Sequence, residues 1–324
     1  MDKAISFIVI GRNEGWKLVK CLESIRFTIE KNVITDAEII YVDSQSTDDS
    51  INNALSFKEV KVFFITGVYN AAIARNIGAK EATGDTLFFI DGDMEIKADF
   101  LPVVYDLKTK KLKYDFVSGQ WINYNYNKDG ILIDREEYNS ERFSDKISAR
   151  TGGLFLIKRK LWEDVAGMKN KMRRSQDLDI ALRLAKRGVF LLRKKELLAI
   201  HHTVPYNDKK RIWHLLFSGA NLYRIVLLRE NFFNKHEWAL FLRGNYTFII
   251  LILCLFLTIF YSNAIYLLFY LISIIVRTFA RGEKSMRFLL TNLLYFPIYE
   301  VSLLFGFFFF WPKNHKEFYV SVDR

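Results

Sequence analysis

The sequence predicts an α/β domain with a mostly parallel sheet, followed by a membrane region of interfacial and transmembrane helices. Up to about Pro205, short apolar runs alternate with helical patterns, which is typical of right-handed βαβ units. Residues 246–311 are instead dominated by Leu, Ile, Phe and Tyr, as expected of segments that cross a bilayer. We therefore divide the 324-residue chain into a domain over 1–205, amphipathic helices over 206–243, and transmembrane helices with a basic tail over 244–324.

The composition restricts the class of protein. The net charge of +11 is compatible with nucleic acid, but the basic residues cluster next to the apolar half and no nucleic-acid-binding signature occurs. We therefore expect no nucleic-acid partner and favour anionic lipid headgroups. Cys21 and Cys254 lie far apart, so no disulfide framework exists and a reducing cytoplasm is compatible. The first apolar run is too short for a secretory signal, which predicts that the domain stays cytoplasmic.

The predicted strands and helices of the domain follow in order. ISFIVI at 5–10 is a continuous apolar run, and apolar residues at helical spacing come after it. EIIYV at 38–42 and VKVFFI at 60–65 form the second and third strands. A helix is predicted over 71–82 and the fourth strand over 86–90. Strands that alternate with helices indicate a parallel sheet covered on both faces.

Polar residues follow three of these strands at the edge where they end. Arg12 to Glu14 come after the first strand, with Asn13 and Glu14 as candidates for binding the nucleotide, Asp43 to Asp48 come after the second, and Asp91 to Asp93 after the fourth. Ligands of open α/β sheets bind at the carboxyl ends of the strands, so these clusters are expected to converge on one site. The alternative for Asp43, taken alone, is an acid that caps the following helix.

Asp91 and Asp93 leave an apolar strand together, spaced by Gly92. Burying an unpaired carboxylate costs several kcal/mol, so we expect the pair in a crevice. Paired carboxylates suit Mg²⁺ or Mn²⁺ shared with a phosphate-bearing substrate, whereas the alternative is a polar turn that faces water. Because neither GxxxxGK[ST] nor GxGxxG occurs, a divalent metal is the natural group to neutralise a nucleotide diphosphate here.

Six segments in order resemble family 2 glycosyltransferases of the GT-A fold. They are ISFIVIGRNEG, VDSQSTDDS, ARNIGAKEATGD, FFIDGD, TGGLFLIKRKLWEDVAGM and QDLDIALRLAKRG, and the resemblance covers about residues 4–205. The resemblance implies that Asp43 contacts the base of a nucleotide-sugar donor and that Arg75 lines the nucleotide pocket. It also implies that Asp91 reaches the ribose or the metal, and that Asp93 is the main metal ligand.

Two positions depart from the family pattern. Ser44 stands where the family usually has a second acid, which leaves the nucleotide preference open, and Gln176 replaces the glutamate that commonly precedes Asp177. By the resemblance, Asp177 is the general base that deprotonates an acceptor hydroxyl. Asp177 and Asp179 are two residues apart on a predicted helix and point in different directions. The alternative is that both acids complement the helix dipole.

Further candidates each have an ordinary alternative. His201 and His202 follow the apolar run LLAI, and one of them, His201 in our assignment, could complete the metal shell or touch the diphosphate. The alternative is a packed or solvated histidine. Trp121 lies in an aromatic, amide-rich stretch suited to an acceptor pocket, where it would stack on a sugar or simply pack. Gly152 and Gly153 allow close approach to a ligand, or form a bulge at a strand start.

The C-terminal part is predicted to associate with a membrane. Residues 209–230 form an amphipathic helix that lies in the interface or packs on the soluble domain. Residues 246–276 form a hairpin of two short helices that turns at Ser262 and Asn263, or one tilted span. Residues 288–311 form a further span. A cytoplasmic loop is marked by the basic residues Arg277, Arg281, Lys284 and Arg287.

Two features of this region leave the number of spans open. Glu300 within the last span lines a pore, contacts another helix, or indicates that the segment re-enters. The basic tail with Lys313 and Lys316 prefers the cytoplasm, which an odd number of spans would not give.

Together these features predict a metal-dependent, inverting glycosyltransferase at the cytoplasmic face of the cell membrane, as a multi-pass protein. It would transfer a sugar from a nucleotide-diphosphate sugar to a hydroxyl of a lipid-linked saccharide, in cell-surface polysaccharide or glycolipid synthesis. The expected cofactor is Mg²⁺ or Mn²⁺. The alternatives are a polyprenyl-phosphate acceptor, or a non-catalytic nucleotide-binding membrane module. The QxxRW motif of processive synthases is absent.

Overall fold

The computed structural model describes residues 4–127, 129–137, 144–205, 209–280 and 285–323. They form two compact units. The first, the N-terminal unit, contains Met1–Asp208 together with Lys313–Arg324, and the second, the helical unit, contains Lys209–Pro312. The chain therefore leaves the first unit and returns to it with its last residues.

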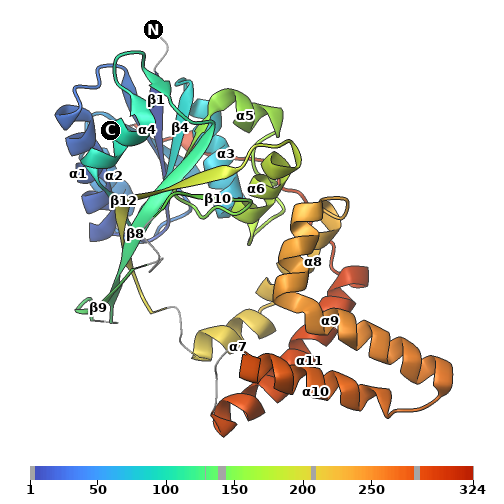
Figure 1. The fold of residues 1–324 in the computed structure, drawn as a ribbon. Helices are drawn as coiled ribbons and strands as arrows, with labels where there is room; N and C mark the ends of the chain where they lie inside the picture. The colour runs from blue at the N-terminus through green and yellow to red at the C-terminus, as the bar shows by residue number, and fades with distance from the viewer. Residues whose placement is uncertain (1–3, 128, 138–143, 206–208, 281–284, 324) are drawn as a thin grey trace. The chain divides into compact units, whose positions relative to one another are not determined.

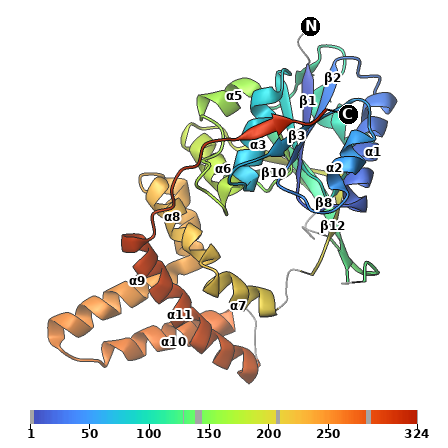
Figure 2. The same ribbon diagram turned by 180° about the vertical axis from the view of Figure 1, so that it is seen from behind.

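One mixed sheet forms the centre of the N-terminal unit (Figures 1 and 2). Its strand order among the described residues is β10-β12-β8-β11-β4-β1-β2-β3-β13, with β5 paired to β12 and β9 paired to β8. The pairs β3/β2, β2/β1, β1/β4 and β8/β12 are parallel, and β11 is antiparallel to both of its neighbours. This arrangement confirms the predicted α/β class with a mostly parallel first half.

The first half alternates strands with helices at the predicted places. Its elements are β1 (Ile5–Gly11), α1 (Trp16–Lys31), β2 (Ala37–Asp43), α2 (Ser50–Leu55), β3 (Val60–Ile65), α3 (Ala71–Glu81) and β4 (Thr86–Asp91). Asp43 and Asp91 are the last residues of their strands, and β1 ends one residue before Arg12. The carboxyl ends of β1, β2 and β4 therefore meet at one edge of the sheet.

The second half adds longer and more irregular strands. Its main elements are β5 (Met94–Ile96), β8 (Phe116–Tyr126), β9 (Leu132–Glu137), β10 (Lys146–Ser148), β11 (Phe155–Lys158), α5 (Arg159–Asp164), α6 (Gln176–Lys186) and β12 (Leu191–Thr203). Between β5 and β8 lie a short helix, α4 (Leu101–Val104), and the small hairpin of β6 (Tyr105–Asp106) and β7 (Lys111–Leu112). The strand β8 runs beside β12, so side chains at the end of β12 reach the same edge as β4.

The central strands are continuous apolar runs because both of their faces are covered. On one face, Leu18, Leu22 and Ile25 of α1 pack in a buried cluster with Phe7 and Val9 of β1. On the opposite face, buried residues of α3 pack with the alternate residues of the same strand, a set that includes Ala72, Ile73, Ile77, Ile8 and Ile10. Burial on both faces fixes the register, so the polar residues are placed at the strand ends.

The C-terminal tail belongs to this sheet. Strand β13 (Tyr319–Ser321) pairs antiparallel with β3, with Tyr319 opposite Ile65 and Ser321 opposite Phe63 (Figure 2). The sequence predicts that the tail belongs with the transmembrane helices, whereas the structure places it at the edge of the α/β sheet. A strand of three residues, of which Val320 and Ser321 are exposed, does not form a recognisable strand pattern, so this pairing was not predicted.

The helical unit contains α7 (Lys209–Phe217), α8 (Tyr223–Glu230), α9 (Lys235–Tyr261), α10 (Tyr266–Ala280) and α11 (Met286–Phe309). Among the described residues, α9 and α11 are long and apolar enough to cross a membrane, and α10 is a shorter apolar helix. The chain turns between α9 and α10 at the expected residues Ser262 and Asn263. Within α9, the backbone of Asn245 is not helical (φ −137°, ψ 30°), and this kink separates residues 246–261, the expected first short helix, from the residues before it. In α8, residues 225–228 are all buried, so this helix packs inside the unit.

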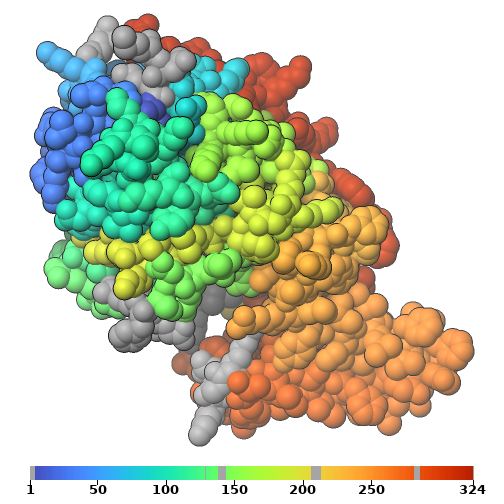
Figure 3. All heavy atoms as spheres, turned by 45° about the horizontal axis from the view of Figure 1, so that its top comes forward, coloured from blue at the N-terminus to red at the C-terminus, as the bar shows by residue number. Residues whose placement is uncertain are grey.

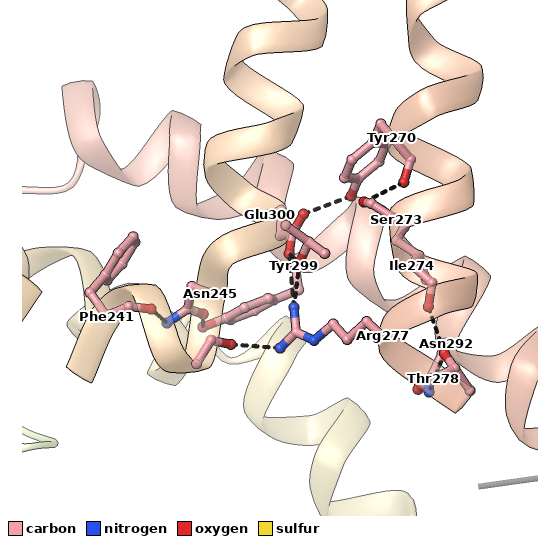
Figure 4. A network of polar contacts seen from close by, with 12 residues as sticks. Phe241, Asn245, Tyr270, Ser273, Ile274, Arg277, Thr278, Asn292, Tyr299 and Glu300 are labelled. Carbon is pink, nitrogen blue, oxygen red and sulfur yellow. Dashed lines mark hydrogen bonds and ion pairs between the residues drawn. The ribbon is translucent and has the colours of Figure 1, made fainter. Parts of the chain in front are cut away.

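A buried polar network joins α9, α10 and α11 (Figure 4). Glu300, fully buried, accepts hydrogen bonds from Thr247 (2.5 Å) and Tyr270 (2.8 Å) and forms an ion pair with Arg277 (3.3 Å). Glu300 was expected to line a pore, to contact another helix, or to mark a re-entrant segment, and the structure shows the contact with other helices. Arg277, expected in a cytoplasmic loop, lies instead in α10 and is 4% exposed, because its guanidinium pairs with Glu300. Two more residues of that expected loop, Arg281 and Lys284, lie outside the described residues.

Candidate active site

A cavity of about 1360 Å³ opens at the carboxyl ends of β1, β2 and β4. It is lined by six of the predicted site residues, which come from distant parts of the N-terminal unit: Glu14, Arg75, Asp91, Asp93, Asp177 and His201. The structure therefore brings these six together in one place, as the sheet topology predicted.

Arg75 and Asp91 form the central ion pair of this cavity. Arg75 projects from α3 and is 2% exposed, and its Nη2 pairs with Asp91 Oδ1 at the end of β4. Its Nε and Nη1 are buried and have no hydrogen-bond partner in the part of the chain that the structure describes. Buried donors without partners are costly, so a ligand oxygen would be the natural partner at this position.

Asp93 lies opposite His201. Asp93 Oδ2 is 3.1 Å from Nε2 of His201, and Nδ1 of His201 is 2.9 Å from Oδ1 of Asn123. The other carboxylate oxygen of Asp93, Oδ1, is buried and has no partner among the described residues. His201 thus stands between the carboxylate of Asp93 and the side-chain amide of Asn123.

The donor set at this point fits a divalent cation that is shared with a substrate. Asp93 offers a buried oxygen without a partner, and a carboxylate beside an imidazole suits Mg²⁺ or Mn²⁺. Within the described residues, no group of three or more His, Cys, Asp or Glu side chains is arranged to hold a metal by itself. A cation here would therefore need oxygens from the substrate or from water to complete its shell.

Glu14 adds a third acid to this wall of the cavity. Burial, together with the negative charge of Asp93, raises the pKa of Glu14 to about 7, although Lys17 acts in the opposite direction. A carboxyl group that costs this much to ionise beside Asp91 and Asp93 indicates an excess of negative charge. This wall of the cavity is thus suited to attract a cation.

Asp177 and Asp179 are separated by the geometry of α6. Asp177 lines the cavity and burial raises its pKa, while Arg75 has the opposite effect. Asp179 is fully buried and forms ion pairs with Arg183 (2.8 Å) and Lys169 (3.4 Å). Only Asp177 is therefore available to a bound substrate, and its raised pKa suits a proton acceptor.

Asp43 and Asn13 do not line the cavity. Asp43 is fully buried, and its carboxylate accepts hydrogen bonds from the backbone N–H of Ser46 (2.7 Å) and the hydroxyl of Tyr41 (2.8 Å). Asn13 accepts the N–H of Thr47 at 2.8 Å. Both residues hold the loops after β1 and β2 in shape, and their predicted contacts with a nucleotide remain predictions.

His202 and Trp121 occupy the second half of the sheet. His202 faces away from the acid pair, with Glu95 at 3.2 Å and the Tyr126 hydroxyl at 2.9 Å, and it is not among the lining residues. Trp121 lines the cavity but is only 6% exposed, and the guanidinium of Arg193 lies 5.0 Å from its ring centroid. The structure therefore gives Trp121 a packing role in addition to its place in the wall.

The comparisons with known proteins identify a domain in the first half of the chain. Residues 6–165 match the family described as glycosyl transferase family 2. The chain carries a family 2 glycosyltransferase domain. The glycosyltransferase GlyG of Streptococcus pneumoniae is 33% identical over 128 residues, which are 38% of this chain and 41% of GlyG. Glycosyltransferase AglE of Haloferax volcanii is 22% identical over 213 residues, 63% of this chain and 68% of AglE. The match to GlyG thus spans less than half of that relative.

Solved structures show the same fold. The crystal structure of Staphylococcus aureus TarS, residues 1–349, superimposes with a TM-score of 0.53 at 13% identity, over 72% of this chain and 66% of that one. A second crystal structure of TarS, in complex with UDP-GlcNAc, gives a TM-score of 0.51, also at 13% identity, over 71% of this chain and 72% of that one. The N-terminal unit of this family 2 protein therefore has the GT-A fold, as the sequence analysis predicted.

Arg12, Arg173 and Arg174 line the cavity together with Gln176. Arg12 belongs to the polar cluster expected after the first strand, whereas Arg173 and Arg174 were not predicted as part of the site. The signal for the arginine pair was present, because the run Arg173–Gln176 leads directly into Asp177. Three guanidinium groups in the lining of one cavity would suit the phosphates of a substrate.

Proposed function

We propose that this family 2 protein is an inverting, metal-dependent glycosyltransferase that moves a sugar from a nucleotide-diphosphate sugar to a hydroxyl of a lipid-linked saccharide. The observation that carries this proposal is a single cavity lined by both acidic and basic side chains. Asp93 and Glu14 are among the acids, and Arg12, Arg173 and Arg174 are among the bases. A diphosphate that carries a divalent cation would match this lining, because arginines bind phosphate oxygens and carboxylates bind the cation.

The roles of the side chains follow from their surroundings. Arg75 offers unpartnered donors in the cavity, which would bind an oxygen of the donor. Asp93, with His201 beside it, would hold Mg²⁺ or Mn²⁺, and the cation would stabilise the nucleoside diphosphate as a leaving group. Asp177 would take the proton from the acceptor hydroxyl, which a raised pKa favours. The TarS complex with UDP-GlcNAc, which has the same fold, supports a nucleotide-sugar as the donor class.

The lipid-linked acceptor is proposed because of the helical unit. The helices α9 and α11 are apolar and long enough to cross a bilayer. The tail after residue 312 returns to the sheet of the N-terminal unit through β13, so both ends of the helical unit lie on one side of a membrane. We infer that the unit crosses the membrane an even number of times or only re-enters it, with the glycosyltransferase domain on the cytoplasmic side.

Transfer to extracted lipids tests this proposal. The full chain in detergent would be incubated with nucleotide-sugars, Mn²⁺ or Mg²⁺, and lipid extracts that contain lipid-linked saccharides. The expected product is a glycolipid with one added sugar whose anomeric configuration is inverted relative to the donor, as NMR of the product would show. Binding of nucleotide-sugars without transfer to any lipid fraction would favour a non-catalytic nucleotide-binding module.

A further inference from the structure

The tail that follows the helical unit touches a loop that lines the cavity. The carbonyl oxygen of Phe318 accepts hydrogen bonds from the backbone N–H groups of Thr66 (2.9 Å) and Gly67 (3.4 Å). The ring of Phe318 covers Gly67, since a Cβ atom at Gly67 would lie 3.0 Å from Cδ2 of that ring. Gly67 to Asn70 are part of the cavity wall. The tail therefore supports this wall from outside.

Asn170 makes a second connection from the tail. Its side-chain Nδ2 donates to the carbonyl of His315 (2.9 Å) and to the carboxylate of Glu317 (3.0 Å). On its other side, Asn170 accepts hydrogen bonds from Asn76 (2.7 Å) and, through its backbone carbonyl, from Asn70 (2.7 Å). Asn170 thus links the tail to the N-cap of α3 at Asn70 and to the middle of α3 at Asn76.

Asn70 transmits this connection to the centre of the site. Its side chain caps α3 by accepting the N–H of Ile73 at 3.0 Å, and α3 carries Arg75. The far end of α3 is held by the same tail, because Tyr319 donates to Glu81 at 2.5 Å. The tail is therefore bonded to the helix that places Arg75 against Asp91, near both of its ends. In Figure 3 the red tail is visible at the surface beside other parts of the N-terminal unit.

We propose that residues 313–322 are a positioning element of the donor site. The tail fixes the loop Gly67 to Asn70 and the start of α3, and it thereby sets the affinity for the nucleotide-sugar. This inference rests on the proposed function. Phe318 and Asn170 are the positioning residues, and neither lines the cavity. The tail directly follows the helical unit, whose last helix is α11. The segment that contacts the wall of the donor site is therefore continuous in sequence with the apolar helices.

Two substitutions separate positioning from folding. Phe318→Ala removes the ring from Gly67, and because Phe318 is 58% exposed its loss should change the melting temperature little. Asn170→Asp removes the Nδ2 donor and places a charge beside Glu317, but keeps an oxygen for Asn76. Val320→Ala is the matched control, since Val320 in β13 lies two residues after Phe318, is 50% exposed, and pairs opposite Phe64, outside the cavity wall.

The experiment compares the three variants with the wild type as full chains in detergent. UDP-GlcNAc, GDP-mannose and dTDP-glucose would first be screened for binding, and the dissociation constant would be measured for the tightest. We expect Phe318→Ala and Asn170→Asp to raise this constant and the donor KM by about tenfold with kcat within about twofold, as for one lost hydrogen bond or contact. Val320→Ala should leave both unchanged.

Hydrogen exchange of residues 66–77 gives a second readout that needs no donor. Both positioning variants should exchange faster in this segment, and the control should not. Unchanged donor binding together with unchanged exchange would overturn the inference, and so would an equal loss in all three variants. If no nucleotide-sugar binds the wild type, the proposed function fails and donor positioning fails with it. Faster exchange of residues 66–77 in the two positioning variants would, in that case, still show that the tail stabilises the cavity wall.

Discussion

Arg75 and Asp91 pair across the cavity because the backbone at Gly153 leaves room for them. A Cβ atom at Gly153 would lie 2.2 Å from Oδ2 of Asp91 and too close to Nη2 of Arg75 as well. The glycine is therefore required by close approach and not by its own backbone angle. Strands β4 and β11 are paired antiparallel, with Phe155 opposite Phe89, which fixes Gly153 beside the end of β4.

Gly153→Ala should push the ion pair apart and lower kcat/KM by about 100-fold, since catalysis is sensitive to displacements of about 1 Å. The matched control is Gly152→Ala, because a Cβ atom there would lie 3.6 Å from Trp121, an ordinary contact. Steady-state kinetics with the best donor, alongside melting temperatures, would check this. Equal activity in both variants would show that the ion pair of Arg75 and Asp91 is not required for catalysis.

Substitutions of Asp177 and Asp179 should have different effects, the first on the catalytic rate and the second on the stability of the fold. Asp177→Asn should lower kcat by roughly 10² to 10⁴ with little change in melting temperature, since the residue would act as a general base. Asp179→Asn should instead destabilise the fold by roughly 3 kcal/mol, because it leaves Arg183 and Lys169 without their buried partner. Kinetics and thermal unfolding of both variants provide the measurement. The reverse pattern would exclude Asp177 as the base.

The same Asp177→Asn variant distinguishes the two acceptor classes. A sugar hydroxyl has to lose its proton, whereas a polyprenyl phosphate is already an anion at neutral pH and needs no base. Full transfer by the variant to a purified lipid phosphate would therefore favour the phosphate acceptor. We expect no such transfer, and loss of transfer to lipid-linked saccharides.

Much of the fold was predictable because its signals are local. Strands 5–10 and 86–90 are apolar runs that end in polar clusters, and the helical spacing between them is visible without any partner. The convergence of Glu14, Asp91 and Asp93 then follows from parallel topology alone. The family 2 domain was recognisable from the order of the motifs, and residues 6–165 match the family model.

Pairings between distant segments could not be predicted. Nothing near Tyr319 indicates that it pairs with Ile65, and nothing near Arg277 indicates that Glu300 lies beside it in the helical unit. The partners of Asp43 could not be predicted either: its carboxylate accepts hydrogen bonds from the hydroxyl of Tyr41 and the backbone N–H of Ser46, while its expected contact with a nucleotide stays a prediction. Such hydrogen bonds depend on loop conformation, which a sequence pattern does not specify.

Glu38 should make the stability of the N-terminal unit depend on acid pH. Burial alone would raise its pKa, but hydrogen bonds from Lys61, Ser6 and Thr83 outweigh burial and lower the pKa to about 2. A carboxyl group with a lowered folded pKa stabilises the protein above its unfolded pKa of about 4.5, and this contribution is lost as the pH falls towards 2. The contribution at neutral pH is roughly 3 kcal/mol.

Glu38→Gln tests this dependence. The melting temperature of the variant should be lower than that of the wild type at pH 7, and the difference should shrink between about pH 4.5 and pH 2. Asp99→Asn is the control, because Asp99 is an exposed carboxylate that pairs with Lys31 at the surface. A difference between wild type and Glu38→Gln that stays constant with pH would contradict the assignment.

The return of the tail to the sheet predicts the membrane topology. In a chain without native cysteines, Lys58→Cys and Val320→Cys place one label in the first half of the N-terminal unit and one in the tail, both at exposed positions. A membrane-impermeant maleimide should label both cysteines from the cytoplasmic side and neither from the other side. Labelling from opposite sides would mean that the chain crosses the membrane an odd number of times. The pairing of β13 with β3 would then not exist in the membrane-inserted protein.

Metal-dependent consumption of the donor tests the central proposal most directly. The full-length wild type and Asp93→Asn would be assayed with the best-binding nucleotide-sugar, with Mn²⁺ and with EDTA, while melting temperatures monitor the fold. We expect turnover in the wild type with Mn²⁺, none with EDTA, and a loss of at least about 10³-fold in Asp93→Asn at an unchanged melting temperature. Equal turnover by the wild type and Asp93→Asn, or turnover unaffected by EDTA, would contradict a metal site at Asp93.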